Sequence, residues 1–193
     1  MATIQPVDLE LIHELRKTGV LENVDAYRIN GDGRNIVVMC SDGHQSSDQI
    51  STHSNYVRRE GCTDHCCHPH MLNGGALLLS PRFTKRSRLP VRQVLESQLR
   101  QSMTLKGANI VALYVHAPCG AAFLRKLSFA DVLDRLFDAK QRVKKIFAKR
   151  RKFHLVCFVQ VDYGDKKRTY FISRKKWETW KAAHAKIEQA IQA

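Results

Sequence analysis

The stretch NIVVMCSDGHQSS, residues 35–47, decides how this chain is interpreted. Its first five residues are nearly all apolar and rich in β-branched side chains, which is typical of a short strand in a sheet covered on both faces. The run then stops at a thiol, a carboxylate and an imidazole spaced two residues apart, Cys40, Asp42 and His44. Either Cys40 is a core residue before a polar turn, or these side chains form half of a metal site.

Length and composition indicate one soluble globular domain. The chain has 193 residues, of which 44% are hydrophobic, and its mean hydropathy is −0.35. Its longest apolar runs, such as ALLL and IVALYV, are far too short to span a membrane. The first residues, MATIQPVDLELIHELRK, lack the basic-then-apolar pattern of a secretory signal, so we expect a cytoplasmic location. In that compartment the six cysteines are expected to be thiols or metal ligands rather than disulfides.

Apolar periodicity predicts alternating strands and helices. Strands are expected at 35–40, GGALLLS (74–80), GANIVALYV (107–115) and HLVCFVQVD (154–162), and YGDKKRTYFIS (163–173) predicts a turn into an antiparallel edge strand. Helices are expected near 7–18, from Pro90 onward, at 129–149 and at 177–191. This alternation favours an α/β fold with a mostly parallel central sheet flanked by helices. We predict one domain over 1–193, with an amino-terminal helix and connection (1–34), a core (35–173) and a carboxy-terminal helix (174–193).

A second group of potential ligands follows the third predicted strand. His116 ends that strand, and Cys119 lies three residues later, in the turn toward the next helix. In open α/β sheets, ligands bind beyond the carboxyl ends of the strands. If the first and third strands are neighbours, Cys40, His116 and Cys119 converge and leave a fourth position for water, substrate or Asp42. Three protein ligands with one open position is the arrangement of catalytic zinc.

These motifs resemble those of the β-class carbonic anhydrases. That family carries C-x-D-x-R on its first strand and H-x-x-C-G on its third, and this chain has CSDGH at 40–44 and HAPCG at 116–120. LNGG, at 72–75, lies where the family has an R-N-x-G turn, and HLVCFVQVDYGD resembles its late strand and hairpin. The resemblance extends over most of the chain, from Asn35 to Ser173.

The resemblance implies a zinc lyase. Zn²⁺ would be bound by Cys40, His116 and Cys119, and Asp42 would either be the fourth ligand or orient a zinc-bound hydroxide. The hydroxide would attack carbon dioxide and bicarbonate would leave. Two thiolates neutralise the ion, so the hydroxide should dominate only at alkaline pH. A homodimer or larger homo-oligomer is implied, with the pocket near the subunit interface.

Two departures from the family pattern concern catalysis. His44 stands in place of the arginine that grips the aspartate in a fork of hydrogen bonds, and Leu72 replaces the arginine of the turn. Asp42 would then either close the site by binding zinc or be held by a single hydrogen bond from His44, which would also shuttle protons. The alternatives to carbon dioxide hydration are a hydrolase of carbonyl sulfide or carbon disulfide and a non-catalytic zinc protein.

The charge of the chain and a second cluster of cysteines and histidines allow further interpretations. The net charge is +14, and much of the excess lies in KQRVKKIFAKRRK (140–152). This run is either the solvated face of an amphipathic helix or a surface for nucleic acid or an acidic partner. Near residue 65, six potential ligands lack a standard zinc spacing and are expected to be free side chains near the pocket: Cys62, His65, Cys66, Cys67, His68 and His70.

Overall fold

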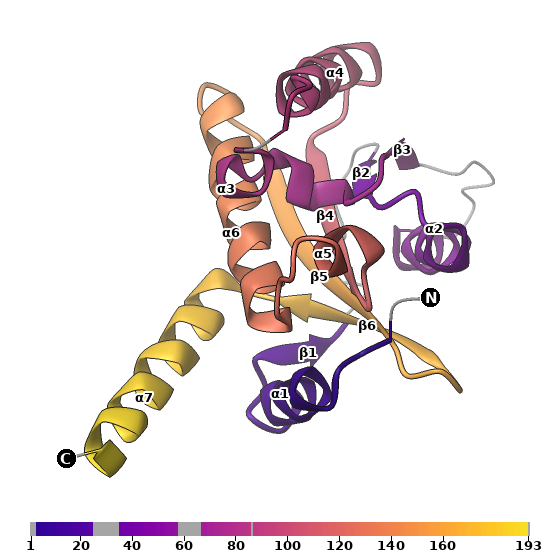
Figure 1. Ribbon diagram of the computed structural model, residues 1–193. Coiled ribbons are helices and arrows are strands. Elements are labelled where there is room, and N and C mark those ends of the chain that lie inside the picture. The colour runs from indigo at the N-terminus through magenta and orange to yellow at the C-terminus, as the bar shows by residue number, and fades with distance from the viewer. Residues whose placement is uncertain (1–2, 25–34, 58–66, 86, 193) are drawn as a thin grey trace.

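A mixed six-stranded sheet forms the centre of the computed structural model, which describes residues 3–24, 35–57, 67–85 and 87–192 (Figure 1). The strand order is β1-β6-β5-β4-β2-β3, with β2 to β5 parallel and with β6 and β1 antiparallel. The predicted α/β fold with a mostly parallel sheet is therefore confirmed. The strands are β1 (Leu21–Asn23), β2 (Asn35–Met39), β3 (Cys67–Met71), β4 (Ile110–Ala117), β5 (His154–Asp162) and β6 (Lys167–Ile172).

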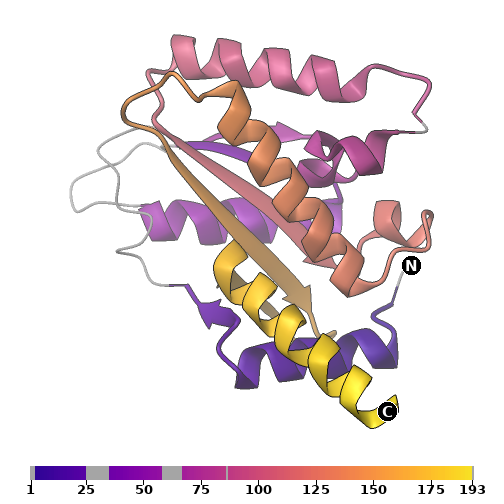
Figure 2. The same ribbon diagram turned by 90° about the vertical axis from the view of Figure 1, so that its left-hand side faces the viewer.

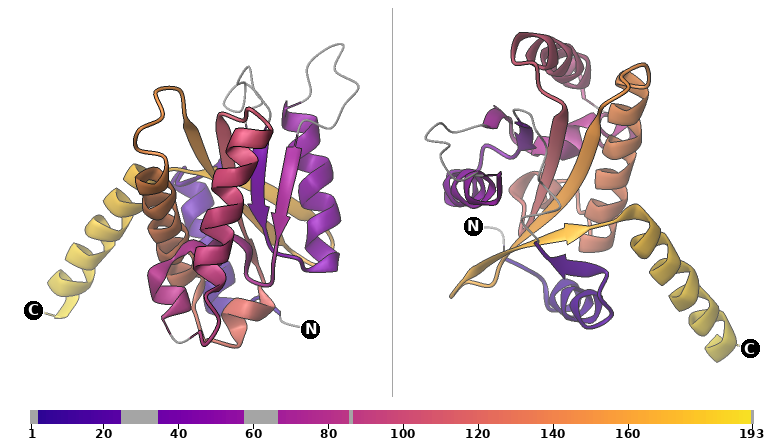
Figure 3. Two further views of the ribbon diagram at one scale, coloured as in Figure 1. Left: turned by 90° about the horizontal axis from the view of Figure 1, so that it is seen from above. Right: turned by 180° about the vertical axis from the view of Figure 1, so that it is seen from behind.

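Helices cover both faces of this sheet. The helical segments are α1 (Pro6–Lys17), α2 (Gly43–Val57), η2 (Gly75–Leu79), α3 (Pro81–Thr84), α4 (Val91–Leu105), α5 (Gly120–Phe123), α6 (Phe129–Ile146) and α7 (Arg174–Gln192). Helices α4 and α6 lie on one face and α2 on the other (Figures 1 and 2). Helix α7 extends away from the body of the molecule (Figure 3). Among the described residues, no helix combines the length and the apolar character that a membrane span requires.

The all-apolar sequence of β2 reflects burial on both faces. Ile36 and Val38 belong to the large core that β4, β5, α4 and α6 share. Val37 and Met39 point the other way, into a smaller core beneath α2. Successive side chains of a strand face opposite sides, so a doubly covered strand needs apolar residues at every position.

The structure corrects the prediction of a strand at GGALLLS. This segment is the 3₁₀-helix η2, and Gly74 and Gly75 before and at its start have φ values of +94° and +50°. Positive φ values turn the chain and are incompatible with an extended strand. On the side of β2 away from β4, the sheet is instead completed by β3, whose sequence CHPHM lacks the continuous apolar run of the other parallel strands.

The hairpin predicted at 163–173 is present, but its second strand is not an edge strand. β6 pairs antiparallel with β5, as expected, and β1 adds on its outer side, with Leu21 opposite Ile172. With only three residues, β1 is too short to show a period. Most of the predicted connection before β2 and the first part of the second Cys/His cluster, including Cys62, His65 and Cys66, lie outside the described residues.

Candidate metal centre

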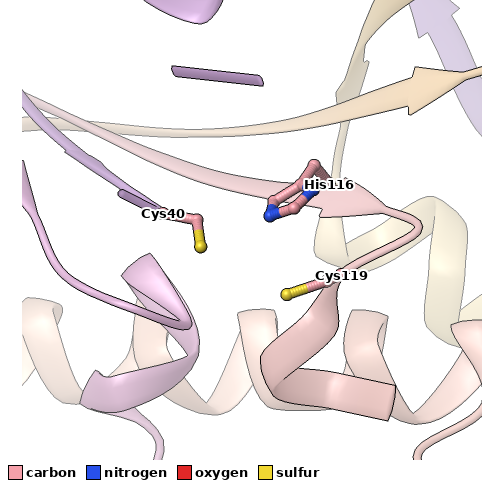
Figure 4. Close-up of side chains that lie close together, drawn as sticks. All are labelled: Cys40, His116 and Cys119. Carbon is pink, nitrogen blue, oxygen red and sulfur yellow. The ribbon is translucent and has the colours of Figure 1, made fainter. Parts of the chain in front are cut away.

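Three buried side chains converge where β2 and β4 end. Cys40 follows β2, His116 is the second-last residue of β4, and Cys119 directly precedes α5 (Figure 4). Because β2 and β4 are paired and parallel, their carboxyl ends lie at the same edge of the sheet. The two sulfurs and a ring nitrogen of His116 lie within 4.8 Å of one another, and each residue is at most 7% exposed. This cluster could hold a metal ion.

Local backbone structure positions the Cys40 sulfur. The N–H of Gly74 donates a hydrogen bond to Cys40 Sγ at 3.2 Å, and the N–H of Ser41 donates to the carbonyl of Leu72 at 3.2 Å. A Cβ atom on Gly75 would lie 2.4 Å from the backbone nitrogen of Cys40, far inside van der Waals contact. The glycine pair of the LNGG turn therefore allows the turn to pass directly against Cys40.

The two cysteines differ in their affinity for protons. A hydrogen bond from the Cys119 thiol is the largest influence on Cys40 and lowers the pKa of its thiol to about 4, against the opposing effect of burial. The same hydrogen bond, followed by burial, raises the pKa of Cys119. Cys40 is therefore a thiolate that accepts a hydrogen bond from the Cys119 thiol. A bound cation would replace that proton, since metal binding requires deprotonated thiols.

His116 has ring nitrogens available to bind a metal ion. Its ring is 1% exposed, and neither Nδ1 nor Nε2 has a hydrogen-bond partner among the described residues. Buried polar atoms without partners are rare in native structures and indicate a place for a water molecule or an ion. Two sulfurs and one imidazole form a donor set that suits a borderline-soft cation such as Zn²⁺.

Asp42 caps helix α2. Its carboxylate Oδ1 accepts a hydrogen bond from the backbone N–H of His44 at 3.0 Å, and its carbonyl oxygen accepts from Ser46 N–H at 2.8 Å. The Asp42 carboxylate is not part of the group of atoms within 4.8 Å of one another. It lies two residues from Cys40, at the rim of the cluster.

The backbone of His44, rather than its ring, is engaged. The side chain of His44 is exposed. The backbone carbonyl oxygen of His44 accepts a hydrogen bond from Lys167 Nζ. Among the described residues, no hydrogen bond joins the His44 ring to the carboxylate of Asp42. The contact between these two residues is therefore the helix cap alone.

A cavity of about 550 Å³ opens beside the cluster. Residues next to the ligands contribute to its wall on one side, among them Asp42 and Pro118. Several other polar residues that line this cavity were not predicted from the sequence. Their only signal was their place at or just after the end of β5 or early in α2: Gln45, Asp48, Asp162, Lys166 and Lys167. A smaller cavity of about 60 Å³ touches His116 and Cys119 from the side of the amino-terminal segment.

Hydrogen bonds tie the wall of the larger cavity together. Gln45 Nε2 donates to Asp162 Oδ2 at 2.8 Å, and the N–H of Gly164 donates to Asp162 Oδ1 at 2.9 Å. Partial burial opposes ionisation, yet these hydrogen bonds lower the pKa of Asp162. The Asp162 carboxylate in this wall is therefore ionised at neutral pH.

The described part of the second cluster lies on β3, at the edge of the sheet. His70 Nε2 is 3.0 Å from Ser102 Oγ, and the rings of His68 and His70 meet edge to face at 5.1 Å. Cys67 Sγ lies 3.7 Å from Ser54 Oγ. None of these three residues lines the 550 Å³ cavity.

Comparison with known proteins places the fold. The sequence matches no protein-family model and no curated protein. A variant of CafD, a β-carbonic anhydrase of the filamentous fungus Aspergillus fumigatus, superposes with a TM-score of 0.51 at 10% identity, over 80% of this chain and 99% of that one. A second CafD variant gives 0.50 at 10% identity, over 79% and 99%. The chain therefore has a divergent β-carbonic-anhydrase fold, as the motifs predicted.

Proposed function

We propose that this protein is a zinc-dependent lyase that hydrates carbon dioxide to bicarbonate. The observation that carries the proposal is the buried Cys40–His116–Cys119 cluster at the carboxyl ends of two parallel strands, beside an open cavity. The β-carbonic-anhydrase fold supports it, because the solved structures that share the fold are described as enzymes of that class.

The protein would hold zinc through two thiolates and one imidazole. Zinc, when bound, would supply a Lewis acid that lowers the pKa of water and polarises a small electrophile. The Gly74 N–H keeps a hydrogen bond on the Cys40 sulfur and so moderates the charge that this thiolate donates. Such contacts to the ligands themselves orient them and tune the metal.

Asp42 would orient the reacting water from the rim of the cluster. Its Oδ1 accepts a hydrogen bond from a backbone N–H, and within the described part of the chain Oδ2 has no hydrogen-bond partner. His44 lines the cavity and is exposed, so it would pass protons between the site and solvent. The role of Asp42, with the alternative that it is the fourth ligand, is assigned on the resemblance to the family, whereas the role of His44 follows from its exposed imidazole beside the cavity.

A second candidate uses the same centre on a different electrophile. The cavity of about 550 Å³ is within the size range of small-molecule sites and would also admit carbonyl sulfide or carbon disulfide. One observation favours a non-catalytic zinc protein. Among the described residues, no side chain makes the pair of hydrogen bonds that would hold the Asp42 carboxylate away from the cluster. We further propose a cytoplasmic location, where Cys40 and Cys119 would stay reduced.

The test combines metal analysis with stopped-flow hydration of carbon dioxide. We expect about one zinc per chain and hydration that rises toward alkaline pH. Cys119→Ala should abolish both. Cys157→Ala is the matched control, because Cys157 is equally buried but lies in the core away from the cluster, and it should retain both.

Three results distinguish the alternatives. Zinc without turnover of carbon dioxide, carbonyl sulfide or carbon disulfide would favour the non-catalytic protein. Turnover of a sulfur compound alone would favour the second candidate. Protein that returns no bound metal after zinc loading would overturn the proposed centre.

A further inference from the structure

Two long segments of the chain contain no carboxylate. No Asp or Glu occurs in residues 97–130 or in residues 139–161, and the second segment carries eight Lys or Arg residues. The two segments pack together at one end of the molecule. Arg100 of α4 donates to the carbonyl of Ile146 at the end of α6, and Arg150 donates to the carbonyl of Ala108 before β4. Positive charge is thereby concentrated with no acidic side chain in either segment.

Five exposed cations form what we call the basic end: Lys144, Lys145, Lys149, Arg151 and Lys152. None of the five makes an ion pair with any residue that the structure describes. Some cations elsewhere are paired. Lys181 contacts Asp134 at 2.6 Å, and Arg142, in the same carboxylate-free segment, binds Glu96 of α4 through two nitrogens. The basic end instead gathers five exposed cations within residues 144–152, and no carboxylate among the described residues neutralises them.

The basic end lies far from the candidate metal centre. Strand β4 runs from Ile110, opposite His154, to His116, opposite Gln160, a length of roughly 20 Å. The metal cluster is at the carboxyl ends of these strands, whereas α6 runs back and ends beside the start of β5 (Figure 2). The cavity beside the cluster is lined by four aspartates, Asp42, Asp48, Asp162 and Asp165. Attraction of bicarbonate to the centre thus does not explain the basic end.

The needs of helix α6 account for only part of this charge. Lys144 and Lys145 lie in the last turn, where cations interact favourably with the helix dipole. Lys149, Arg151 and Lys152 follow the helix and make no such contribution. Five unneutralised cations repel one another in the free protein, so an anionic partner would relieve a cost that the fold itself does not offset.

We infer that the basic end binds the phosphate backbone of double-stranded nucleic acid, without sequence preference. Cations that neutralise phosphates supply most of such binding. Single strands also require aromatic platforms for their bases, but the nearby phenylalanine rings, Phe147 and Phe153, pack against each other with centroids 5.0 Å apart and a tilt of 46°, one buried and one half-buried.

A membrane surface fits this region less well. Binding to lipid needs apolar side chains that insert beside the cations. Among the described residues, no large apolar side chain in residues 139–161 is strongly exposed. At the neighbouring end of α4, Leu105 is the one such side chain. Duplex DNA and duplex RNA share the phosphate chemistry, so both belong in the test.

The experiment measures fluorescence anisotropy of labelled mixed-sequence DNA and RNA duplexes at several salt concentrations. With five phosphate contacts, the slope of log affinity against log salt should be about −4.5, or a loss of several hundredfold between about 50 and 200 mM salt. Substitution of all five cations of the basic end by Gln should weaken binding at least about a hundredfold and flatten this slope.

The matched control removes the same number of exposed charges elsewhere, through Gln at Lys17, Lys85, Arg88, Lys126 and Lys175. It should bind almost as the unchanged protein does. Equal weakening in the two variants would overturn the inference, because binding would then follow net charge alone. So would an absence of binding at low salt, or tighter binding to vesicles rich in anionic lipid than to either duplex. Zinc content should be the same in all three proteins, which keeps this test independent of the proposed function.

Discussion

At the scale of single residues, the position of the Cys40 sulfur depends on glycines that are distant from it in sequence. Gly74 supplies the N–H that contacts the sulfur, and Gly75 has no side chain where a Cβ would overlap the Cys40 backbone. The LNGG turn is therefore as necessary to the cluster as the ligands themselves. A side chain at position 75 would push the turn away from the Cys40 backbone.

Gly75→Ala should disrupt the metal centre. The added Cβ would meet backbone atoms at 2.4–2.5 Å, and φ of +50° is unfavourable for alanine. We expect a loss of roughly 3 kcal/mol or more in the free energy of unfolding, measured in urea, together with loss of bound zinc.

Gly107→Ala is the control for backbone strain. Gly107 has a φ of +60°, yet a Cβ there would meet nothing within 4 Å. It should cost only about 1–2 kcal/mol and leave zinc content unchanged. Full zinc occupancy in Gly75→Ala would refute the role given to the turn.

His44→Arg should raise carbon dioxide hydration. Among the described residues, a backbone N–H alone holds the Asp42 carboxylate, and an arginine could add a forked, charge-assisted hydrogen bond that keeps it off the metal. One such contact corresponds to roughly a tenfold gain in kcat. His44→Gln, which offers no charged fork, is the control. Unchanged or lower activity in His44→Arg, with zinc still bound, would count against this role for Asp42.

At the scale of elements, helix α2 buries polar side chains against the sheet. Gln45, Gln49 and His53 recur every four residues and are at most 4% exposed. His53 Nδ1 lies 3.0 Å from the hydroxyl of Tyr114, and its ring meets Phe158 edge to face. Because these residues are polar, the sequence pattern predicts that this face of α2 is exposed to solvent, whereas the structure buries it.

Burial of His53 predicts a dependence of stability on pH. Desolvation lowers the pKa of His53 from 6.5 to about 4, so the folded state holds the ring neutral while the unfolded state binds a proton. Its contribution is complete above pH 6.5 and is lost as pH falls from 6.5 toward 4. By about pH 5 the loss should be roughly 2 kcal/mol.

Urea unfolding of His53→Gln at about pH 7.5 and about pH 5 tests this contribution. The variant should lose about 2 kcal/mol less than the unchanged protein between the two pH values. Substitution of the exposed His154 by Gln should preserve the full loss. If His53→Gln and the unchanged protein lose stability equally, His53 is not the group responsible.

At the scale of the whole molecule, we expect a homodimer formed on the side of the metal centre. Phe123 ends α5 and Leu124 follows it, and their exposed fractions are 60% and 81%. Phe123 also lines the small cavity that His116 and Cys119 touch. Large apolar side chains exposed together indicate an interaction surface. A partner that covered them would also shield the cluster from solvent.

Light scattering after size-exclusion chromatography tests this expectation. The protein should elute as a dimer. Serine at both Phe123 and Leu124 changes four side chains across the two copies, and since each buried side chain contributes roughly 2 kcal/mol, association should weaken on the order of a millionfold. Leu105→Ser, at an equally exposed site on α4, should have no effect. A monomeric unchanged protein at micromolar concentration would contradict the prediction.

Sequence alone determined the elements whose pattern is local and strong. The strand predicted at HLVCFVQVD is β5 residue for residue, and the helices at both ends and before β5 are present within a few residues. Their apolar periods report directly which side is buried, because burial of apolar area is the main favourable contribution to folding. The order of strand-ending ligands also pointed to Cys40, His116 and Cys119 before any geometry was known.

Only the tertiary structure decided where local pattern and burial disagree. η2 replaced a predicted strand because two glycines with positive φ turn the chain against Cys40, a contact across 35 residues that no local window contains. The polar face of α2 is buried and the histidines of β3 are half-buried although these residues are polar, since their neighbours supply partners such as Tyr114 and Ser102. The convergence of the three ligands likewise required β2 and β4 to be paired, and long-range pairing is a property of the folded chain.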